Sequence, residues 1–140
     1  MPKYGPILIV EDDEDDRLVM EEVFIDMGSK YERIYFNRSQ EALEFLSTTL
    51  IQPFLVISDV NLPGMDGPEF KLTLNKNEYL RKKSIPFVFL TTTAKRQAVD
   101  KAYEMMVQGY FEKPNNLKET KTLLKLIVDY WQICIHPNTF

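Results

Sequence analysis

Short, uninterrupted apolar runs recur along the chain, and they constrain its fold more than any other feature. Three runs are strong and two weaker ones follow a glycine break: Ile7–Val10, Phe54–Ile57 and Phe87–Leu90, then Ile34–Phe36 and Tyr110–Phe111. Runs of this length without polar alternation are typical of parallel strands that are buried on both faces. The pattern predicts five strands.

Between these runs, apolar residues recur with the period of a helix. The predicted helices contain Met20, Val23, Phe24 and Met27; Ser39–Thr48, with Ser39 as the cap; Pro68–Asn75; Ala98, Ala102, Met105 and Met106; and Asn116–Trp131. The last has the clearest stripe: Leu117, Leu123, Leu124, Ile127, Val128 and Trp131. These Met and aromatic residues match the helix period and are interpreted as core.

Five strand–helix repeats predict the α/β class: a doubly wound, five-stranded parallel sheet covered on both faces. With 140 residues the chain has the size of one compact domain. We expect this domain at residues 1–131, followed by a short tail at 132–140. Ligands of such sheets bind beyond the carboxyl ends of the strands, where the strand order reverses.

Composition and charge exclude several classes of function. The net charge of −4 disfavours direct nucleic-acid binding. No apolar run reaches 18 residues and the N-terminal apolar run is too short for a signal peptide, so we expect no membrane contact and a cytoplasmic location. The lone Cys134 and lone His136 lack the partners that a disulfide or a zinc site requires.

Chemically active side chains follow four of the predicted strands. Glu11 and Asp12 follow the first, Asp59 the third, Thr91 the fourth and Lys113 the fifth. Three carboxylates in one crevice repel one another unless a cation neutralises them. Hard oxygen ligands around a small site favour Mg²⁺.

The acidic run from Glu11 to Asp16 has a second interpretation as a solvated surface. We prefer that interpretation for Glu14, Asp15 and Asp16, because acids are favourable in the first turn of a helix. Asp13 is the expected cap, with Asp16 three residues on. An EF-hand loop beginning at Asp12 fails, because glycine and glutamate are missing at the required positions.

Four motifs together resemble the signature of response-regulator receiver domains: ILIVEDD, LVISDVNLPGMDG, PFVFLTTTA and GYFEKP. The resemblance covers about Ile7 to Trp131 and implies a flavodoxin-like fold with strand order 2-1-3-4-5. The ending DYWQICIHPN is similar to the tails of single-domain regulators that partner phytochrome-type histidine kinases.

The resemblance also implies a role for each residue of the crevice. Asp59 is the phosphoacceptor and also a ligand of Mg²⁺, together with Asp12 directly, Glu11 through water and Asn61 through its backbone carbonyl. Lys113 neutralises charge on the phosphoryl group and Thr91 bonds one of its oxygens. Tyr110 is the switch residue whose rotamer follows Thr91. In isolation, Lys113 is an ordinary surface lysine, the Thr91 region a strand-favouring sequence and Tyr110 a static core aromatic.

The implied function is two-component signal transduction, with a sensor histidine kinase as phosphodonor and a downstream protein target or phosphotransfer protein as receiver of the signal. The chain would catalyse only its own phosphorylation and dephosphorylation. The apolar tail, with Tyr130, Trp131, Ile133, Ile135 and Phe140, leaves two arrangements open: a homodimer, or a tail packed on its own last helix.

Three other functions compete with this one. A phosphatase of the haloacid-dehalogenase type needs a second acid two residues after the nucleophile, where this chain has Asn61. A flavodoxin needs a hydroxyl-rich phosphate loop after the first strand, where this chain has acids. A receiver-like interaction module that is never phosphorylated remains the third alternative.

Overall fold

The computed structural model describes residues 5–136 and contains one five-stranded parallel sheet. The strands are β1 (Ile7–Val10), β2 (Arg33–Phe36), β3 (Leu55–Ser58), β4 (Phe87–Thr91) and β5 (Gly109–Glu112). The helices are α1 (Glu14–Asp26), α2 (Ser39–Thr48), α3 (Gly67–Lys76), α4 (Glu78–Lys83), α5 (Arg96–Glu104) and α6 (Leu117–Ile133). The strand order is β2-β1-β3-β4-β5, so the predicted fold class and strand order are confirmed.

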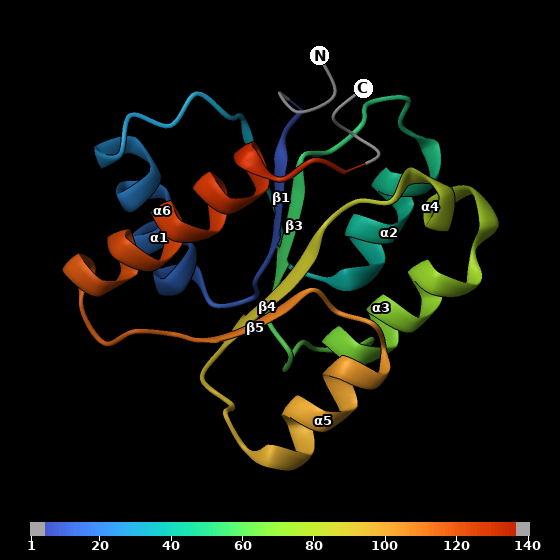
Figure 1. Ribbon diagram of the computed structural model, residues 1–140. Helices are drawn as coiled ribbons and strands as arrows, with labels where there is room; N and C mark the ends of the chain where they lie inside the picture. The colour runs from blue at the N-terminus through green and yellow to red at the C-terminus, as the bar shows by residue number, and fades with distance from the viewer. Residues whose placement is uncertain (1–4, 137–140) are drawn as a thin grey trace.

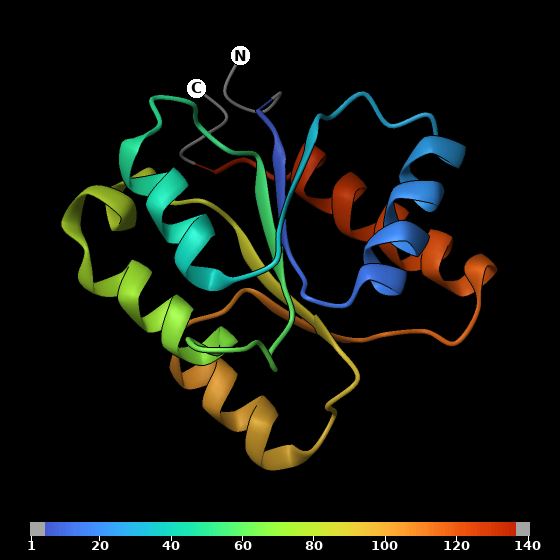
Figure 2. The same cartoon turned by 180° about the vertical axis from the view of Figure 1, so that it is seen from behind.

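Helices cover both faces of the sheet, as right-handed crossovers require. Figures 1 and 2 show α1 and α6 together on one face, with α2, α3, α4 and α5 on the other. Each face has its own cluster of buried apolar side chains: one joins β1 and β3 to α1 and α6, and the other joins them to α2 and α3. The order of the strands reverses between β1 and β3, which places the predicted crevice at the carboxyl ends of these two strands.

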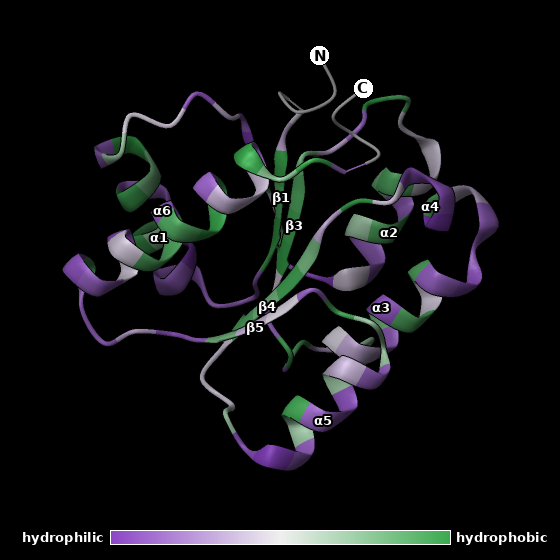
Figure 3. Cartoon of the chain, viewed as in Figure 1, coloured by the Kyte–Doolittle hydropathy of each residue, from purple (hydrophilic) through white to green (hydrophobic). Residues whose placement is uncertain are grey.

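The three central strands explain why the apolar runs are uninterrupted. Every residue of β1, β3 and β4 is buried. Figure 3 shows these strands as hydrophobic along their length, while the helices alternate between hydrophobic and hydrophilic residues. The edge strand β2 is only half-buried, which accounts for its weaker sequence pattern.

A sixth helix, α4, was not predicted. Asn77 caps its start by accepting a hydrogen bond from the Leu80 backbone N–H at 3.0 Å, and Ser84 ends it in the left-handed conformation with φ 50°. Six residues give fewer than two turns, and Leu80 is the only one of them that is buried. A helix this short carries no apolar period to detect.

Three details of the predicted helices are wrong. Ser39 is the first residue of α2 and not its cap; Arg38 holds that position and makes no capping hydrogen bond. Met106 lies beyond the end of α5 with φ 63° and is 73% exposed. Leu117 is half exposed, because it starts α6 at the carboxyl end of the sheet, where the helix has not yet reached the core.

The last helix continues two residues past the predicted end at Trp131. The Trp131 side chain packs against the core cluster of its own domain, and its ring lies 5.8 Å from that of His136. The predicted boundary between domain and tail stays a prediction, and Phe140 lies outside the described residues. None of the described helices is both long and apolar enough to cross a membrane.

Candidate functional site

The carboxyl ends of β1, β3 and β5 meet around an acidic cleft of about 610 Å³. Its lining is polar and mostly acidic: Glu11, Asp12, Asp13, Glu14, Asp15, Asp16, Asp59, Thr92 and Lys113. Parallel strands end at the same edge of the sheet, so residues that are far apart in the sequence converge here. The predicted crevice therefore contains Glu11, Asp12, Asp59 and Lys113.

Lys113 lies at the centre of this cleft and contacts three carboxylates. Its Nζ lies 2.6 Å from Glu11 Oε1, 2.8 Å from Asp59 Oδ2 and 2.7 Å from Asp16 Oδ2. Burial opposes its charge, but hydrogen bonds to Asp16, Asp59 and Glu11 outweigh this effect and raise the pKa of Lys113 above its usual range. A cation fixed among carboxylates supplies the positive charge that an incoming phosphate group needs.

Glu11 is the most deeply buried acid of the cleft, with 2% of the residue exposed. Burial raises its pKa to about 7; the charge of Asp59 adds to this increase, while the contact with Lys113 opposes it. The second carboxylate oxygen, Oε2, accepts a hydrogen bond from the Asp13 backbone N–H at 3.2 Å. The pocket thus holds more negative charge than Lys113 alone neutralises.

Asp59 is held at the end of β3 by the backbone that follows it. Its Oδ1 accepts hydrogen bonds from the N–H groups of Val60 at 2.6 Å and Asn61 at 3.2 Å. Its backbone N–H donates to Val10 O at 3.0 Å, which ties the acid to the end of β1. The residue is 8% exposed and lines the cleft.

The remaining predicted ligands flank this centre. Asp12 is exposed and lines the cleft directly after Glu11. The Asn61 side chain does not line the cleft, and its Nδ2 donates a hydrogen bond to Thr93 Oγ1 at 2.6 Å. This contact joins the residue two beyond Asp59 to the residue two beyond Thr91.

The donor set fits a magnesium ion. Among residues 5–136, no group of three or more Asp, Glu, His or Cys side chains is already arranged to hold a metal ion. Mg²⁺ does not require such a group, because it keeps several waters and takes one or two carboxylates. Excess carboxylate charge next to the Asn61 backbone is the chemistry of such a site.

Thr91 and Tyr110 lie beside the cleft without lining it. Thr91 is fully buried as the last residue of β4, and its Oγ1 accepts a hydrogen bond from the Thr93 N–H at 3.3 Å. The Tyr110 hydroxyl donates to the Thr93 carbonyl oxygen, and its ring lies 6.0 Å from that of Phe89. Burial and then the charge of Asp59 raise the pKa of Tyr110.

The sequence analysis placed the residues from Asp13 to Asp16 outside the predicted crevice and did not single out Thr92, but all of them line the cleft. Asp16 was expected to be solvated, but its carboxylate bonds Lys113. The signal was present: Asp13 caps α1 by accepting from the Asp16 N–H at 3.0 Å, so Asp16 lies in the first turn, close to the end of β1. The threonine that lines the cleft is Thr92 and not Thr91.

Comparison with known proteins gives a consistent result. The family model of the response regulator receiver domain matches residues 7–125. The chain is 32% identical over 130 residues to the response regulator Rcp1 of Synechocystis sp., covering 89% of this chain and 87% of the relative.

Two solved structures are similar over nearly the whole chain. The phosphorylated cyanobacterial phytochrome response regulator RcpA has a TM-score of 0.83 and 25% identity, covering 94% of this chain and 96% of that one. The Mn²⁺-bound form of Rcp1 has a TM-score of 0.79 and 30% identity, covering 93% and 96%.

Proposed function

The chain belongs to the response regulator receiver domain family, and we propose that it is a phosphorylation switch of a two-component system with Asp59 as the acceptor. The observation that carries this proposal is the contact of 2.8 Å between Lys113 Nζ and the Asp59 carboxylate at the base of an acidic cleft. Asp59 lines this cleft although only 8% of the residue is exposed.

The transfer step requires little protein chemistry beyond positioning. A carboxylate oxygen of Asp59 attacks the phosphorus of a phosphohistidine, the P–N bond breaks, and its electron pair stays on the leaving imidazole nitrogen. The N–H groups of Val60 and Asn61 keep the carboxylate oriented. Lys113 offsets the negative charge that the phosphoryl group brings.

Mg²⁺ would be held by Asp12 and Asp59 directly, by Glu11 through water and by the backbone carbonyl of Asn61. When bound, the ion neutralises charge on the equatorial phosphoryl oxygens. The existence of a Mn²⁺-bound form of the similar Rcp1 supports the binding of a divalent ion. The buried Glu11, with its raised pKa, gains most from a second cation in the cleft.

Thr91 and Tyr110 would carry the signal away from Asp59. A phosphoryl group on Asp59 draws the Thr91 hydroxyl towards it, and Tyr110 then changes rotamer. Both residues already share Thr93 as a hydrogen-bond partner. On the other face of the sheet, an apolar hollow of about 300 Å³ on β5 and α6, lined in part by Phe111, Leu126 and Tyr130, offers a surface to a downstream protein.

The upstream partner is a sensor histidine kinase, and the similarity to the phytochrome response regulator RcpA favours one of the phytochrome type. The signal leaves by contact with a downstream protein or by phosphotransfer.

The end of α6 carries exposed apolar side chains. Tyr130, Ile133 and Ile135 are exposed by 59–80%, which favours a homodimer through this end of α6. Sedimentation of the full chain and of a form ending at Gln132 tests it: the truncated form should dimerise less.

The haloacid-dehalogenase alternative is disfavoured by the residue two beyond Asp59. That position is Asn61, whose amide is bonded to Thr93 and offers no acid to protonate a leaving group. We therefore propose no turnover of small phosphate esters.

The proposal is tested by incubating the purified chain with acetyl phosphate and measuring the intact mass. We expect one added phosphoryl group with Mg²⁺ and a much smaller yield with a chelator. Asp59→Asn should gain none. Equal labelling of the wild type and the variant would contradict the proposal, and no labelling of either would favour the interaction module.

A further inference from the structure

Lys71 is a buried cation that the phosphorylation site does not use. It lies on α3, does not line the cleft that contains Lys113, and is only 8% exposed. Its ammonium donates one hydrogen bond, to Asn75 Oδ1 at 3.1 Å, and lies 5.4 Å from the centre of the Phe87 ring. Within residues 5–136, no carboxylate lies within 4.0 Å of this ammonium.

A buried ammonium without a counter-ion is unfavourable, and two of its three N–H donors remain available. Burial lowers the pKa of Lys71. Proteins normally pair such a charge with a carboxylate or another anion. Among the described residues, 5–136, Lys71 therefore lacks a negatively charged partner.

Lys71 lines a cavity of about 520 Å³ at the end of the sheet remote from Asp59. Most of the wall is apolar and is formed by Val56, Leu74, Leu80, Ile85, Pro86, Phe87, Met106 and Trp131. The polar residues of the wall, besides Lys71, are Asn75, Arg81, Ser84, Gln108 and His136. The Asn75 amide that accepts from Lys71 also donates to the Met105 carbonyl at 2.9 Å, which fixes it between α3 and the end of α5. A concave apolar space with few convergent polar groups is the usual form of a small-molecule site.

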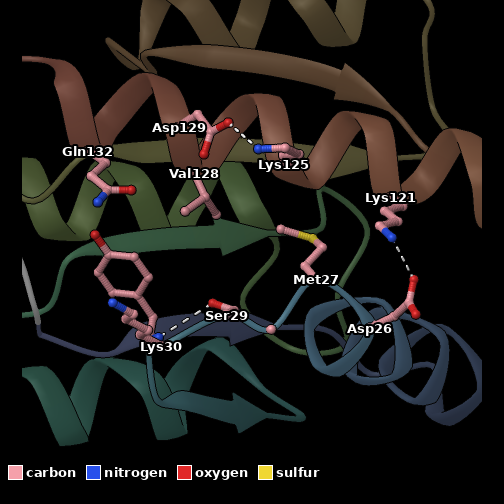
Figure 4. A pocket seen from close by; sticks show the side chains of 11 residues that line it. Asp26, Met27, Ser29, Lys30, Lys121, Lys125, Val128, Asp129 and Gln132 are labelled. Atoms are coloured by element: carbon pink, nitrogen blue, oxygen red, sulfur yellow. Dashed lines mark hydrogen bonds and ion pairs between the residues drawn. The ribbon is translucent and has the colours of Figure 1, made fainter.

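A second cavity of similar size lacks these properties. It lies between the end of α1 and α6, and Figure 4 shows Lys121 beside Asp26 and Lys125 beside Asp129. Lys121 pairs with Asp26 and Lys125 with Asp129, each at 2.8 Å. These two lysines already have their counter-ions, and Lys30, the third lysine of the lining, is exposed to solvent, so an anion has little to gain there.

We propose that the Lys71 cavity is a binding site for a small organic monoanion, with its carboxylate on Lys71 and Arg81 and its apolar body against Leu80, Phe87 and Trp131. The site is separate from the phosphorylation cleft. Its occupant supplies the missing counter-ion, and its apolar part covers the exposed apolar wall. A free inorganic anion would satisfy the charge but leave that wall in contact with water.

The test uses 3-phenylpropionate as the probe and its neutral amide as the matched control. Trp131 is the single tryptophan and lines the cavity, so its fluorescence reports occupancy, with calorimetry as the second measurement. We expect saturable binding of the acid, with the amide about tenfold weaker or more, because it lacks the charge that Lys71 bonds. Acetate should bind more weakly than 3-phenylpropionate.

Two variants then locate the contact. Lys71→Met should lose about tenfold or more in affinity for the acid while keeping a native fold, since methionine suits a buried position better than lysine. Lys76→Met removes the same charge from the exposed end of the same helix and should bind like the wild type. Equal binding of acid and amide, unchanged binding by Lys71→Met, or no saturable binding at millimolar concentration would each overturn the proposal.

Discussion

Gly67 places a helix start directly against the backbone of the proposed phosphoacceptor, and replacing it with alanine tests that arrangement. A Cβ at this position would lie 2.5 Å from the Asp59 carbonyl oxygen, 2.7 Å from Phe89 Cε1 and 2.9 Å from Val60 Cα. Ordinary contacts of a Cβ atom begin at 3.4 Å, so α3 and the end of β3 must separate by roughly 1 Å.

Two opposing effects decide the sign of the change. Alanine favours the helix over glycine by about 1 kcal/mol. Overpacking against a rigid backbone costs about 1–3 kcal/mol. We expect this cost to exceed the gain in helix propensity, because two of the three close atoms are backbone atoms of Asp59 and Val60. Gly67→Ala should therefore lower the free energy of unfolding by up to about 2 kcal/mol.

The same displacement should slow phosphorylation. A shift of roughly 1 Å at a reacting group can reduce a rate about a hundredfold, so we expect a loss of tenfold or more. Urea unfolding gives the stability, and intact mass against time with acetyl phosphate gives the rate. A Gly67→Ala variant that is as stable and as rapidly phosphorylated as the wild type would refute the reasoning.

Gly28→Ala is the matched control. Gly28 has φ 65°, and a Cβ there meets no atom within 4 Å. Alanine should cost about 1–2 kcal/mol from the left-handed conformation alone. Phosphorylation should be unchanged, which separates an effect on Asp59 from a general loss of stability.

Three further predictions concern other parts of the molecule. Asp12→Asn should weaken Mg²⁺ binding about tenfold or more, measured by calorimetry; unchanged affinity would remove this residue from the metal site. Asn61→Glu and Thr93→Ala should each change the decay rate of the phosphorylated form, because their 2.6 Å bond joins the segments that follow Asp59 and Thr91; two wild-type rates would exclude them from the mechanism. Arg33 holds the pKa of Glu21 below its usual value of 4.5, so the ionised carboxyl stabilises the fold above that pH and this stabilisation is lost as the pH falls through the lowered pKa. Glu21→Gln should therefore flatten the pH dependence of the free energy of unfolding between about pH 5 and pH 3. Parallel curves for the wild type and the variant would contradict this.

Most residues of the candidate site could be predicted because the topology of a parallel sheet determines which residues converge. Once the apolar runs are interpreted as parallel strands, the residues after each strand must meet at one edge of the sheet. Glu11, Asp12, Asp59 and Lys113 follow from position alone, and the cleft brings these four together.

The parts that failed depend on local three-dimensional detail. Asp16 differs from Asp15 only in the side of the first turn of α1 on which it lies, and this side decides which of them reaches Lys113. Helix α4 depends on the Asn77 cap and on the left-handed Ser84, which leave no periodic pattern. Lys71 occupies a buried position of α3 that composition would assign to an apolar residue, so the cavity beside it has no signature in the sequence.

The location of the phosphoryl bond tests the central claim most directly. Borohydride reduction of the phosphorylated chain converts an acyl phosphate into an alcohol, and peptide sequencing by mass spectrometry then identifies the modified residue. We predict modification of Asp59 alone, in the segment that joins β3 to α3. Modification of Asp12, Asp16 or any other acid in place of Asp59 would contradict the account.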